Sequence, residues 1–519
     1  MINKKQHNPF KKESKFKNFF KSFKIYIRSL SKIVFILLTY LAILLIGTIF
    51  LATPLTWSNP NSKVSIIDAL FTSSSAFSDT GLVVFDTYKQ WNIFGQILIA
   101  TLILLGGIGI FAFKVWIFHF IFRKKKLSLN DIQLISIERA PQQNDTARKT
   151  IIDSVTTLMV VLISFSLILS FYFYWIEPNN PGLINNVDYI SPHKNWSLAF
   201  RYGFFHTISA LNNAGFDIIG QNSLSAYQYN YSLHVLFLIL LLIGGLGFPV
   251  IHDFINFLRF RIINGRHIHY QWRLITKIST LTYLIITVIG FFLILLTELS
   301  STDSEHFINA KIDGYEISKS HKIWQLFFTS ISTRSAGFAL IDNNIFTPSG
   351  KIILLILMFI GAGPASTGGG IRTTTFAILM ISLFSRLSGR ESTRAFRRTI
   401  SEETVKMSFY VFFSALILVL TTALICSSSL NHYPRSPLAT TEINNEFTMT
   451  DVFFEVTSAF GTCGLGTGLS AQLNVTSKIF LILTMFIGQF GVSSTILLWG
   501  RKTNYSYKYD YITEDISIG

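Results

Sequence analysis

Long apolar runs, separated by short polar strips, divide this sequence. The first run, Ile33 to Ala52 (IVFILLTYLAILLIGTIFLA), contains no charged residue. A helix of about 20 apolar residues crosses a hydrocarbon core roughly 30 Å thick, and this run is longer than the apolar core of a signal peptide. Half of the 519 residues are apolar and 14% are charged. We therefore expect an all-α membrane protein rather than a set of soluble domains.

Eight transmembrane helices account for the apolar runs. They cover approximately residues 33–53, 91–122, 149–176, 231–260, 273–298, 350–385, 404–427 and 476–500. Much of the net charge of +16 lies in strips between these runs, such as Arg259 to Lys277, and acidic or mixed strips such as Glu177 to His193 alternate with them. Basic strips mark the cytoplasmic side. The alternation predicts a multi-pass plasma-membrane protein with both termini in the cytoplasm, and it argues against nucleic-acid binding.

One segment of fourteen residues recurs four times outside the apolar runs. The copies read DALFTSSSAFSDTG, YGFFHTISALNNAG, WQLFFTSISTRSAG and DVFFEVTSAFGTCG, and they align without a gap on Gly81, Gly215, Gly337 and Gly464. A second small-residue cluster follows each copy within an apolar run, as GGIG, GGLG, GAGPASTGGG and GQFG. Each unit therefore consists of a span, a short helix, a glycine turn and a second span.

The repeats define the organisation of the chain. Units 1 to 4 cover residues 33–122, 149–260, 273–385 and 404–500, after a basic N-terminal segment (1–32) and before a cytoplasmic tail (501–519). Because every unit starts and ends on the cytoplasmic side, the copies are parallel, and we expect them to surround a central axis normal to the membrane. All four glycine turns then lie in its outer half.

The glycine turns predict a cation pore. Irregular backbone at membrane depth is tolerated only where it is buried in protein or lines a water-filled path. Four such segments around one axis can direct carbonyl groups inward, where they replace the hydration shell of a cation. Glycine permits the backbone angles that this requires, and the C-terminal dipole of each short helix favours a cation. Close helix packing explains the GGIG and GGLG glycines, but it does not explain a gap-free repeat outside the spans.

The unit and the strings TGLVVFDT, NNAGFD, TRSAGF and GTCGLGTGLS resemble the Trk/Ktr/HKT superfamily of potassium transporters, over about Ile33 to Trp499. The layout is most similar to the Ktr-type membrane subunit (KtrB). The resemblance implies K+ as the transported ion, a homodimer with one pore in each protomer, and a cytoplasmic KtrA-like regulatory ring, through which alone a nucleotide would act. A Na+-conducting or Na+-coupled transporter of the same fold is the alternative, although glycine in all four turns favours potassium.

The resemblance assigns four filter segments, whose backbone carbonyls would bind the ion. Their residues are Asp79, Thr80, Gly81, Leu82, Asn213, Ala214, Gly215, Phe216, Ser335, Ala336, Gly337, Phe338, Thr462, Cys463, Gly464 and Leu465. Asp79 departs from the usual uncharged residue. It would add a cation site at the outer mouth, or it would pair with a neighbour such as Arg334. Cys463 fits as a small residue.

The second span of unit 3 is interrupted by GAGPASTGGGIRTTTF, from Gly361 to Phe376. Three consecutive glycines and a proline do not sustain a helix, and residues 350–385 exceed the roughly 20 residues that a span needs. The family places an intramembrane gating loop here, which we call the third-unit loop; a kinked helix is the alternative. We expect Arg372 to face the cytoplasmic vestibule. Gln489 replaces an arginine that is usual in unit 4 of the family. Without that positive charge the barrier repels cations less, and we expect the gate to depend more on the third-unit loop. The candidate gate residues are Gly361, Gly363, Pro364, Gly368, Gly369, Gly370, Arg372 and Gln489.

Two other classes of protein were weighed. A secondary transporter with a midplane site would show inverted repeats and ionisable residues in the spans, whereas these repeats are parallel. An enzyme would need a nucleophile with its base, or a metal-ligand spacing, within the spans; two cysteines, Cys426 and Cys463, supply neither. His252 and Asp253 suggest a proton relay, but they are read as residues at a span end. We therefore expect a transporter and not an enzyme.

Overall fold

The structure is a computed structural model. It describes residues 31–60, 63–120, 129–138, 144–180, 190–220, 223–265, 268–303, 306–310, 317–429 and 447–492. Most of the predicted basic segment (1–32), the end of the last predicted span (493–500) and the predicted tail (501–519) lie outside the described residues.

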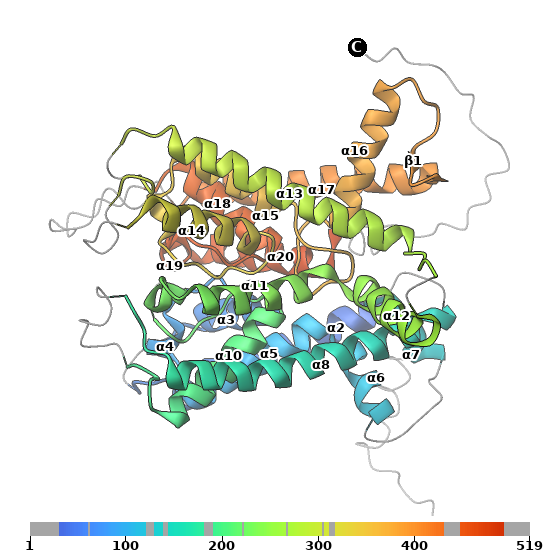
Figure 1. The fold of residues 1–519 in the computed structure, drawn as a ribbon. Helices are drawn as coiled ribbons and strands as arrows, with labels where there is room; N and C mark the ends of the chain where they lie inside the picture. The colour runs from blue at the N-terminus through green and yellow to red at the C-terminus, as the bar shows by residue number, and fades with distance from the viewer. Residues whose placement is uncertain are drawn as a thin grey trace, which may run out of the picture.

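Helices build all four units (Figure 1). Unit 1 contains α2 (Lys32–Leu51), α3 (Ile66–Phe77), α5 (Ile93–Ile108) and α6 (Ile110–Phe120). Unit 2 contains α8 (Asn144–Trp175), α10 (Trp196–Leu211), α11 (Tyr231–Leu246) and α12 (Phe248–Asn264). Unit 3 contains α13 (Leu274–Leu299), α14 (Lys319–Ser332), α15 (Pro348–Phe359) and α16 (Thr373–Leu387). Unit 4 contains α17 (Glu402–Ser427), α18 (Met449–Gly461) and α20 (Val475–Phe490).

Shorter elements connect these helices. They are η1 (Pro54–Thr56), α4 (Thr87–Gln90), α7 (Leu129–Glu138), η2 (Ser223–Tyr227), η3 (Asn343–Ile345), α19 (Leu469–Gln472) and a two-stranded antiparallel ribbon, β1 (Arg394–Ala395) with β2 (Arg398–Thr399). In Figure 1, units 1 and 2 form one half of the molecule and units 3 and 4 the other. The ribbon and α12 lie at the opposite end from α4, α14 and α19.

One helix in each unit precedes the glycine turn, and we call these helices (α3, α10, α14 and α18) the short helices. All four begin in the same way. A side chain before the first turn accepts a backbone N–H three residues later: Ser65 from Asp68 in α3, Asn195 from Leu198 in α10, Ser318 from His321 in α14, and Thr448 from Asp451 in α18. Such N-caps satisfy a donor that the helix leaves unpaired. Each short helix then ends a few residues before the repeated glycine of its unit.

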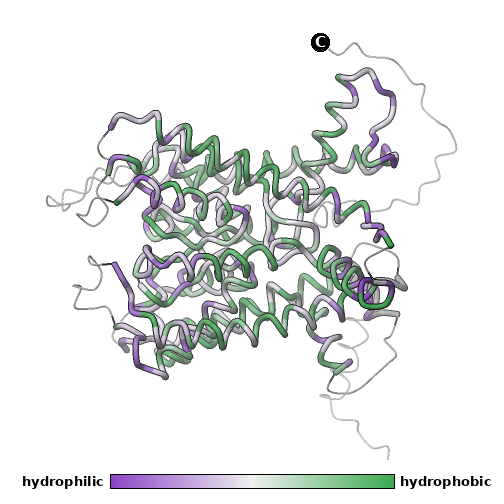
Figure 2. Tube along the Cα trace, in the orientation of Figure 1, coloured by the Kyte–Doolittle hydropathy of each residue, from purple (hydrophilic) through white to green (hydrophobic). Residues whose placement is uncertain are grey.

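The long helices present apolar side chains outward. The first helix of every unit has more than one apolar residue that is at least half exposed, for example Ile49 (65%), Val160 (59%), Leu296 (66%) and Ile417 (60%). Hydrophobic residues extend along these helices in Figure 2. By length and composition, α2, α13, α17 and residues Arg148–Trp175 of α8 can cross a membrane, and the total is six if each bent pair counts as one span. Together with the outward apolar surface, these helices indicate a multi-pass membrane protein.

The second spans are broken in more than one unit. We expected an interruption only in unit 3, but α5 and α6 meet at 90° and α11 and α12 at 103°. The breaks occur at Gly109 (φ 90°) and Gly247 (φ 88°), and Gly491 (φ 95°) follows α20 in unit 4. The predicted spans 91–122 and 231–260 are therefore not single straight helices. Each GGIG or GGLG string ends in a glycine whose positive φ turns the chain.

Candidate functional site

The four glycine turns meet in a closed ring. A Cβ atom added to Gly81 would lie 2.2 Å from the Ala214 carbonyl oxygen, and one on Gly215 would lie 2.8 Å from that of Ala336. One on Gly337 would lie 2.0 Å from the Cys463 oxygen, and one on Gly464 would lie 2.3 Å from the Thr80 oxygen. Each turn therefore packs against the turn of the next unit, and unit 4 closes on unit 1.

The backbone of the ring has a positive φ at the same two positions in each unit. The first residue of every filter segment has a positive φ: 52° at Asp79, 57° at Asn213, 125° at Ser335 and 46° at Thr462. The glycine two residues later is also positive, between Gly337 at 68° and Gly464 at 88°. Non-glycine residues rarely adopt such angles. Their recurrence at equivalent positions makes the segments four copies of one built structure.

The N–H groups of the filter segments turn back toward the short helices. The backbone nitrogen of Thr80 donates to the Ser75 carbonyl (2.8 Å), that of Ala214 to Ser209 (2.8 Å) and that of Cys463 to Ser458 (2.9 Å). In unit 3 the Ala336 nitrogen donates to Ser332 (2.8 Å). Two carbonyl groups also turn back, since Ser209 and Ser332 of the short helices donate to the carbonyl oxygens of Phe216 (2.7 Å) and Phe338 (2.6 Å). The carbonyl oxygens of Thr80, Ala214, Ala336 and Cys463 instead face the glycine turn of a neighbouring unit.

One side of the ring opens into a cavity of about 330 Å³. All four repeated glycines line it, and so does one carboxylate from each unit: Asp86, Asp217, Asp342 and Glu455. We call this cavity the acidic vestibule. Glu455 is buried, whereas Asp86, Asp217 and Asp342 are at least partly exposed. These three carboxylates create a negative potential, which concentrates cations at the opening.

The other side of the ring is covered by the third-unit loop. Its backbone is irregular from Gly361 to Arg372, between α15 and α16, whereas Thr373 to Phe376 belong to α16 and not to the predicted loop. The Thr462 hydroxyl accepts the N–H of Gly369 at 2.7 Å. The Asn213 amide lies 3.3 Å from the Thr367 hydroxyl.

The remaining two units also reach this loop. A Cβ atom on Gly368 would lie 1.8 Å from the Ser335 hydroxyl oxygen. Asp79 is linked through Gln489, whose Nε2 donates both to Asp79 Oδ2 (3.0 Å) and to the Thr367 carbonyl (2.9 Å). The first residue of every filter segment therefore contacts the loop, directly or through one side chain.

Asp79 does not occupy the position expected for it. It lies at the loop-facing end of its filter segment and is fully buried, so its predicted place at the outer mouth is wrong. The other neighbour considered, Arg334, donates to the Gly361 carbonyl (2.7 Å) and lies 5.0 Å from the Tyr283 ring. Arg334 therefore holds the start of the third-unit loop.

Hydrogen bonds attach the loop to units 2 and 4. Toward unit 2, the Gly363 nitrogen donates to the Gly245 carbonyl (2.8 Å), and the Phe248 nitrogen donates to the Ala365 carbonyl (3.2 Å). Pro364 is part of the same contact, since a Cβ atom on Gly247 would lie 2.2 Å from its carbonyl oxygen.

Toward unit 4, the Arg372 guanidinium donates to the Gln489 carbonyl (3.3 Å). It also donates to Gly368 and Ser366 within the loop. Arg372 thus folds against the loop instead of pointing into an open vestibule. Gly370, at φ 74°, packs on Gly361 where the loop returns to α16.

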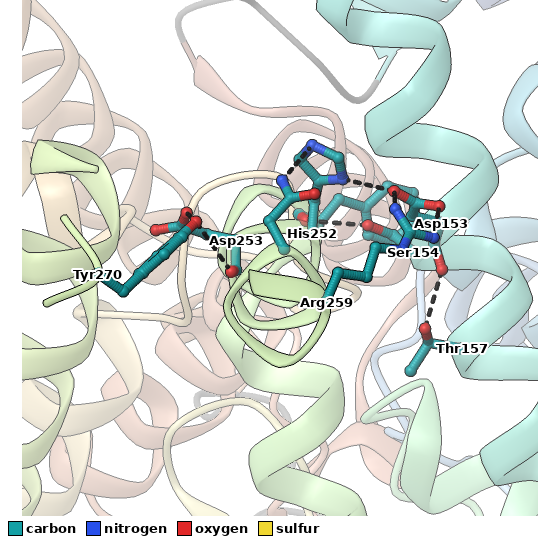
Figure 3. Close-up of polar contacts among 9 residues, drawn as sticks. Asp153, Ser154, Thr157, His252, Asp253, Arg259 and Tyr270 are labelled. Carbon is teal, nitrogen blue, oxygen red and sulfur yellow. Dashed lines mark hydrogen bonds and ion pairs between the residues drawn. The ribbon is translucent and has the colours of Figure 1, made fainter. Parts of the chain in front are cut away.

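A polar cluster fixes the unit-2 helix to which the loop is attached (Figure 3). Asp153 on α8 binds Arg259 of α12 through both carboxylate oxygens (2.8 and 3.0 Å) and His252 at 2.9 Å. Ser154 donates to the Phe248 carbonyl at 2.9 Å. The Phe248 residue therefore joins the loop through its N–H and α8 through its carbonyl group. Asp153, Ser154 and Arg259 were missed by the sequence analysis, since charged and hydroxyl residues at a span end carry no distinctive pattern.

The cluster continues to the segment that precedes α13. Tyr270 donates to Asp253 Oδ1 at 2.6 Å, and the Arg273 nitrogen donates to Oδ2 at 3.1 Å. Burial, with the hydrogen bond to Asp253, raises the pKa of Tyr270 to about 12. The hydroxyl therefore remains a donor at neutral pH. His252 and Asp253 each hold a neighbouring segment in place. These contacts are a structural role for the two residues, which the sequence had suggested as a proton relay.

The chain matches the family model for TrkH, described as a cation transport protein, over residues 42–504. It is 31% identical to the Ktr system potassium uptake protein D of Bacillus subtilis, over 95% of this chain and 98% of that protein. It is 29% identical to the potassium/sodium uptake protein NtpJ of Enterococcus hirae, with the same coverage. Among solved structures, the potassium transporter TrkH from Vibrio parahaemolyticus matches with a TM-score of 0.58 at 18% identity, over 89% of this chain and 84% of that one.

Proposed function

This chain belongs to the Trk/Ktr family of cation transport proteins, and from that premise we propose that it takes up potassium through a four-strand carbonyl filter. Its relatives are transporters and not enzymes, so the coarser function, cation uptake, follows from the family itself. The closed ring of glycine turns is the observation that carries the finer proposal. Main-chain oxygens of four segments around one axis replace the water that K+ loses on entering.

The proposed direction of transport is inward. Cations gather in the acidic vestibule, pass the filter segments and reach the third-unit loop. The electrochemical gradient drives this flow. In this proposal the protein crosses the plasma membrane eight times, with each bent or interrupted second helix counted as one crossing and with both termini in the cytoplasm. The outward apolar residues of α2, α8, α13 and α17 support this topology.

The third-unit loop acts as the gate. It contacts the first residue of every filter segment, directly or through Gln489, so an ion that leaves the filter cannot continue until the loop moves. Membrane subunits of this family act with regulatory partners. We assign to this chain a homodimer and a cytoplasmic, nucleotide-binding ring that pulls on helices attached to the loop, of which α12 is the nearest candidate.

The test is ion flux through the purified protein in liposomes. The wild-type protein should pass K+ and Rb+, and it should restore growth of a potassium-uptake-deficient strain at low potassium. Gly337→Ser should reduce the flux at least about tenfold, since a side chain at φ 68° would meet the Cys463 oxygen. The matched control is Gly389→Ser, at φ 69° with open space around it, which should leave the flux unchanged. Equal flux in the two variants, or no K+ flux in the wild type, would contradict the proposal.

Sodium transport is the second candidate, because one close relative is named a potassium/sodium uptake protein. The same liposomes separate the two: a potassium filter gives flux with external K+ or Rb+ and little with Na+ alone. Comparable flux with Na+ alone would assign the chain to sodium as well. A requirement for Na+ during K+ flux would instead indicate coupling of the two ions.

A further inference from the structure

The loop-facing end of the filter carries one carboxyl side chain. Asp79 is the first residue of its filter segment, and the equivalent residues Asn213, Ser335 and Thr462 are uncharged. The four positions share the positive φ of the ring and face the third-unit loop. The ring is therefore symmetric in backbone but asymmetric in charge, with its single carboxylate in unit 1.

Gln489 holds the Asp79 carboxylate in a defined orientation. Its Nε2 donates to Oδ2, although the two residues are 410 positions apart in the sequence. The equivalent position is Gly107 in unit 1, Gly245 in unit 2 and Ala362 in unit 3, so among the four units only unit 4 provides a polar side chain there. A neutral amide orients a carboxylate without removing its charge. A buried carboxylate needs a positive charge nearby, because its ionised form is otherwise strongly disfavoured.

Arg372 is a positively charged residue of the third-unit loop, and it lies next to the contact between Gln489 and Asp79. Its guanidinium donates to the carbonyl group of Gln489, the residue whose side chain holds Asp79. It also donates to Ser366 and Gly368, within the loop itself. Asp79, by contrast, is fixed at the end of α3. If the loop moves away, Arg372 leaves with it and the carboxylate stays.

We propose that Asp79 forms a cation site at the loop-facing end of the filter, and that a permeating cation replaces Arg372 as its counter-charge when the loop opens. The ligands would be the Asp79 carboxylate and the hydroxyl oxygens of Ser335 and Thr462, the residues at the equivalent position of units 3 and 4. Thr462 Oγ1 is released when the Gly369 N–H withdraws. Hard cations take such oxygen ligands. Opening of the loop and occupation of this site therefore favour each other.

This inference rests on the proposed function, and it predicts a particular block by divalent cations. A divalent ion of about the size of K+, such as Ba²⁺, is attracted to a carboxylate site twice as strongly as a monovalent ion at the same distance. Block from the loop side should therefore depend on Asp79. Block from the vestibule side should depend on the vestibule carboxylates instead.

The experiment measures K+ current through the full-length protein in planar bilayers, with Ba²⁺ added to one chamber at a time. Asp79→Asn keeps the acceptor for Gln489 but removes the charge, and it should raise the half-blocking Ba²⁺ concentration on the loop side at least about tenfold. Asp342→Asn, in the vestibule, is the matched control and should leave loop-side block unchanged. An unchanged loop-side block in Asp79→Asn would overturn the proposal.

Arg372→Gln provides an independent arm if Asp79→Asn does not fold. It removes the competing charge, so loop-side block should strengthen about threefold or more, and Asp79→Asn/Arg372→Gln should lose that gain. The same strengthening in the double variant would overturn the proposal, since the gain would not pass through Asp79. If the wild type conducts no K+, the proposed function fails, but Ba²⁺ binding remains measurable as a rise in Tm. That rise should be smaller in Asp79→Asn, and an equal rise in both proteins would overturn the cation site.

Discussion

The two ends of the proposed pathway are built on different principles. At the vestibule end each unit contributes one glycine turn at the same position of the repeat, so the fourfold repeat is preserved there. Each unit also contributes one carboxylate, although the four carboxylates do not all occupy equivalent positions of the repeat. At the loop end the repeat is abandoned: unit 1 provides Asp79, unit 3 provides the loop with Arg372, and unit 4 provides Gln489.

This difference separates ion recognition from control. A ring that treats an ion equally from four sides must be symmetric, and duplicated sequence supplies such symmetry directly. A gate needs an element that moves while its surroundings stay fixed, and one unit with a longer interruption supplies it. Units 1 and 2 turn their second helices at a single glycine, Gly109 or Gly247, whereas unit 3 inserts the irregular segment from Gly361 to Arg372.

The strongest test of this separation is to shorten the loop. Deleting Ala365 to Gly369 removes the contacts to Phe248, Thr462 and Gln489 together. Basal K+ flux should rise at least about tenfold, because the closed arrangement loses most of its attachments. The preference for K+ over Na+ should not change, since the filter segments stay in place. Flux assays in liposomes with both ions measure the two quantities.

Two outcomes would break the comparison. Unchanged flux in the deletion variant would remove the loop from the gate. Flux that rises with loss of K+ preference would show that the loop also shapes the filter, so that recognition and control would not be separate.

Much of the vestibule end was predictable from the sequence. Gly81, Gly215, Gly337 and Gly464 align without a gap, and a repeated glycine outside a span has few uses other than a required backbone angle. The structure places all four in one ring with positive φ. The prediction was precise because the same glycine recurs at the same position of four repeats.

The loop end was predictable only in outline. The interruption after Gly361 was visible because it contains three consecutive glycines, but the contacts that hold it were not. Asp79 and Gln489 each depart from the family pattern, but nothing in the sequence indicates that these residues, 410 positions apart, form a hydrogen bond. The bends at Gly109 and Gly247 were missed because GGIG and GGLG have an adequate explanation in helix packing. Unrepeated contacts leave no second copy from which to recognise them.

A smaller effect is expected from the cluster behind α12. Arg259→Gln removes the bidentate ion pair with Asp153 and loosens the helix whose Phe248 binds the loop. An ion pair of this kind contributes of the order of 1 kcal/mol, so basal K+ flux should rise about threefold. Flux in liposomes measures it.

Thr157→Val is the matched control for that variant. Thr157 bonds only the backbone carbonyl of Asp153 in the cluster of Figure 3, and its loss should leave the flux unchanged. If Arg259→Gln and Thr157→Val behave alike, α12 does not transmit force to the loop. In that case the regulatory ring must act on the gate through another helix.

The smallest expected effect belongs to the vestibule carboxylates. Asp86→Asn/Asp342→Asn removes two of the four acidic groups that line the cavity, one each from units 1 and 3. K+ flux at low ionic strength should fall about twofold, because the local cation concentration falls with the negative potential. Near 0.15 M salt the Debye length shrinks to about 8 Å, and the difference from wild type should largely disappear. A deficit that persists at high salt would mean that these carboxylates bind the ion directly. The vestibule would then be a second ion-binding site. The two ends of the pathway would differ in how many carboxylates they contain, but not in what those carboxylates do.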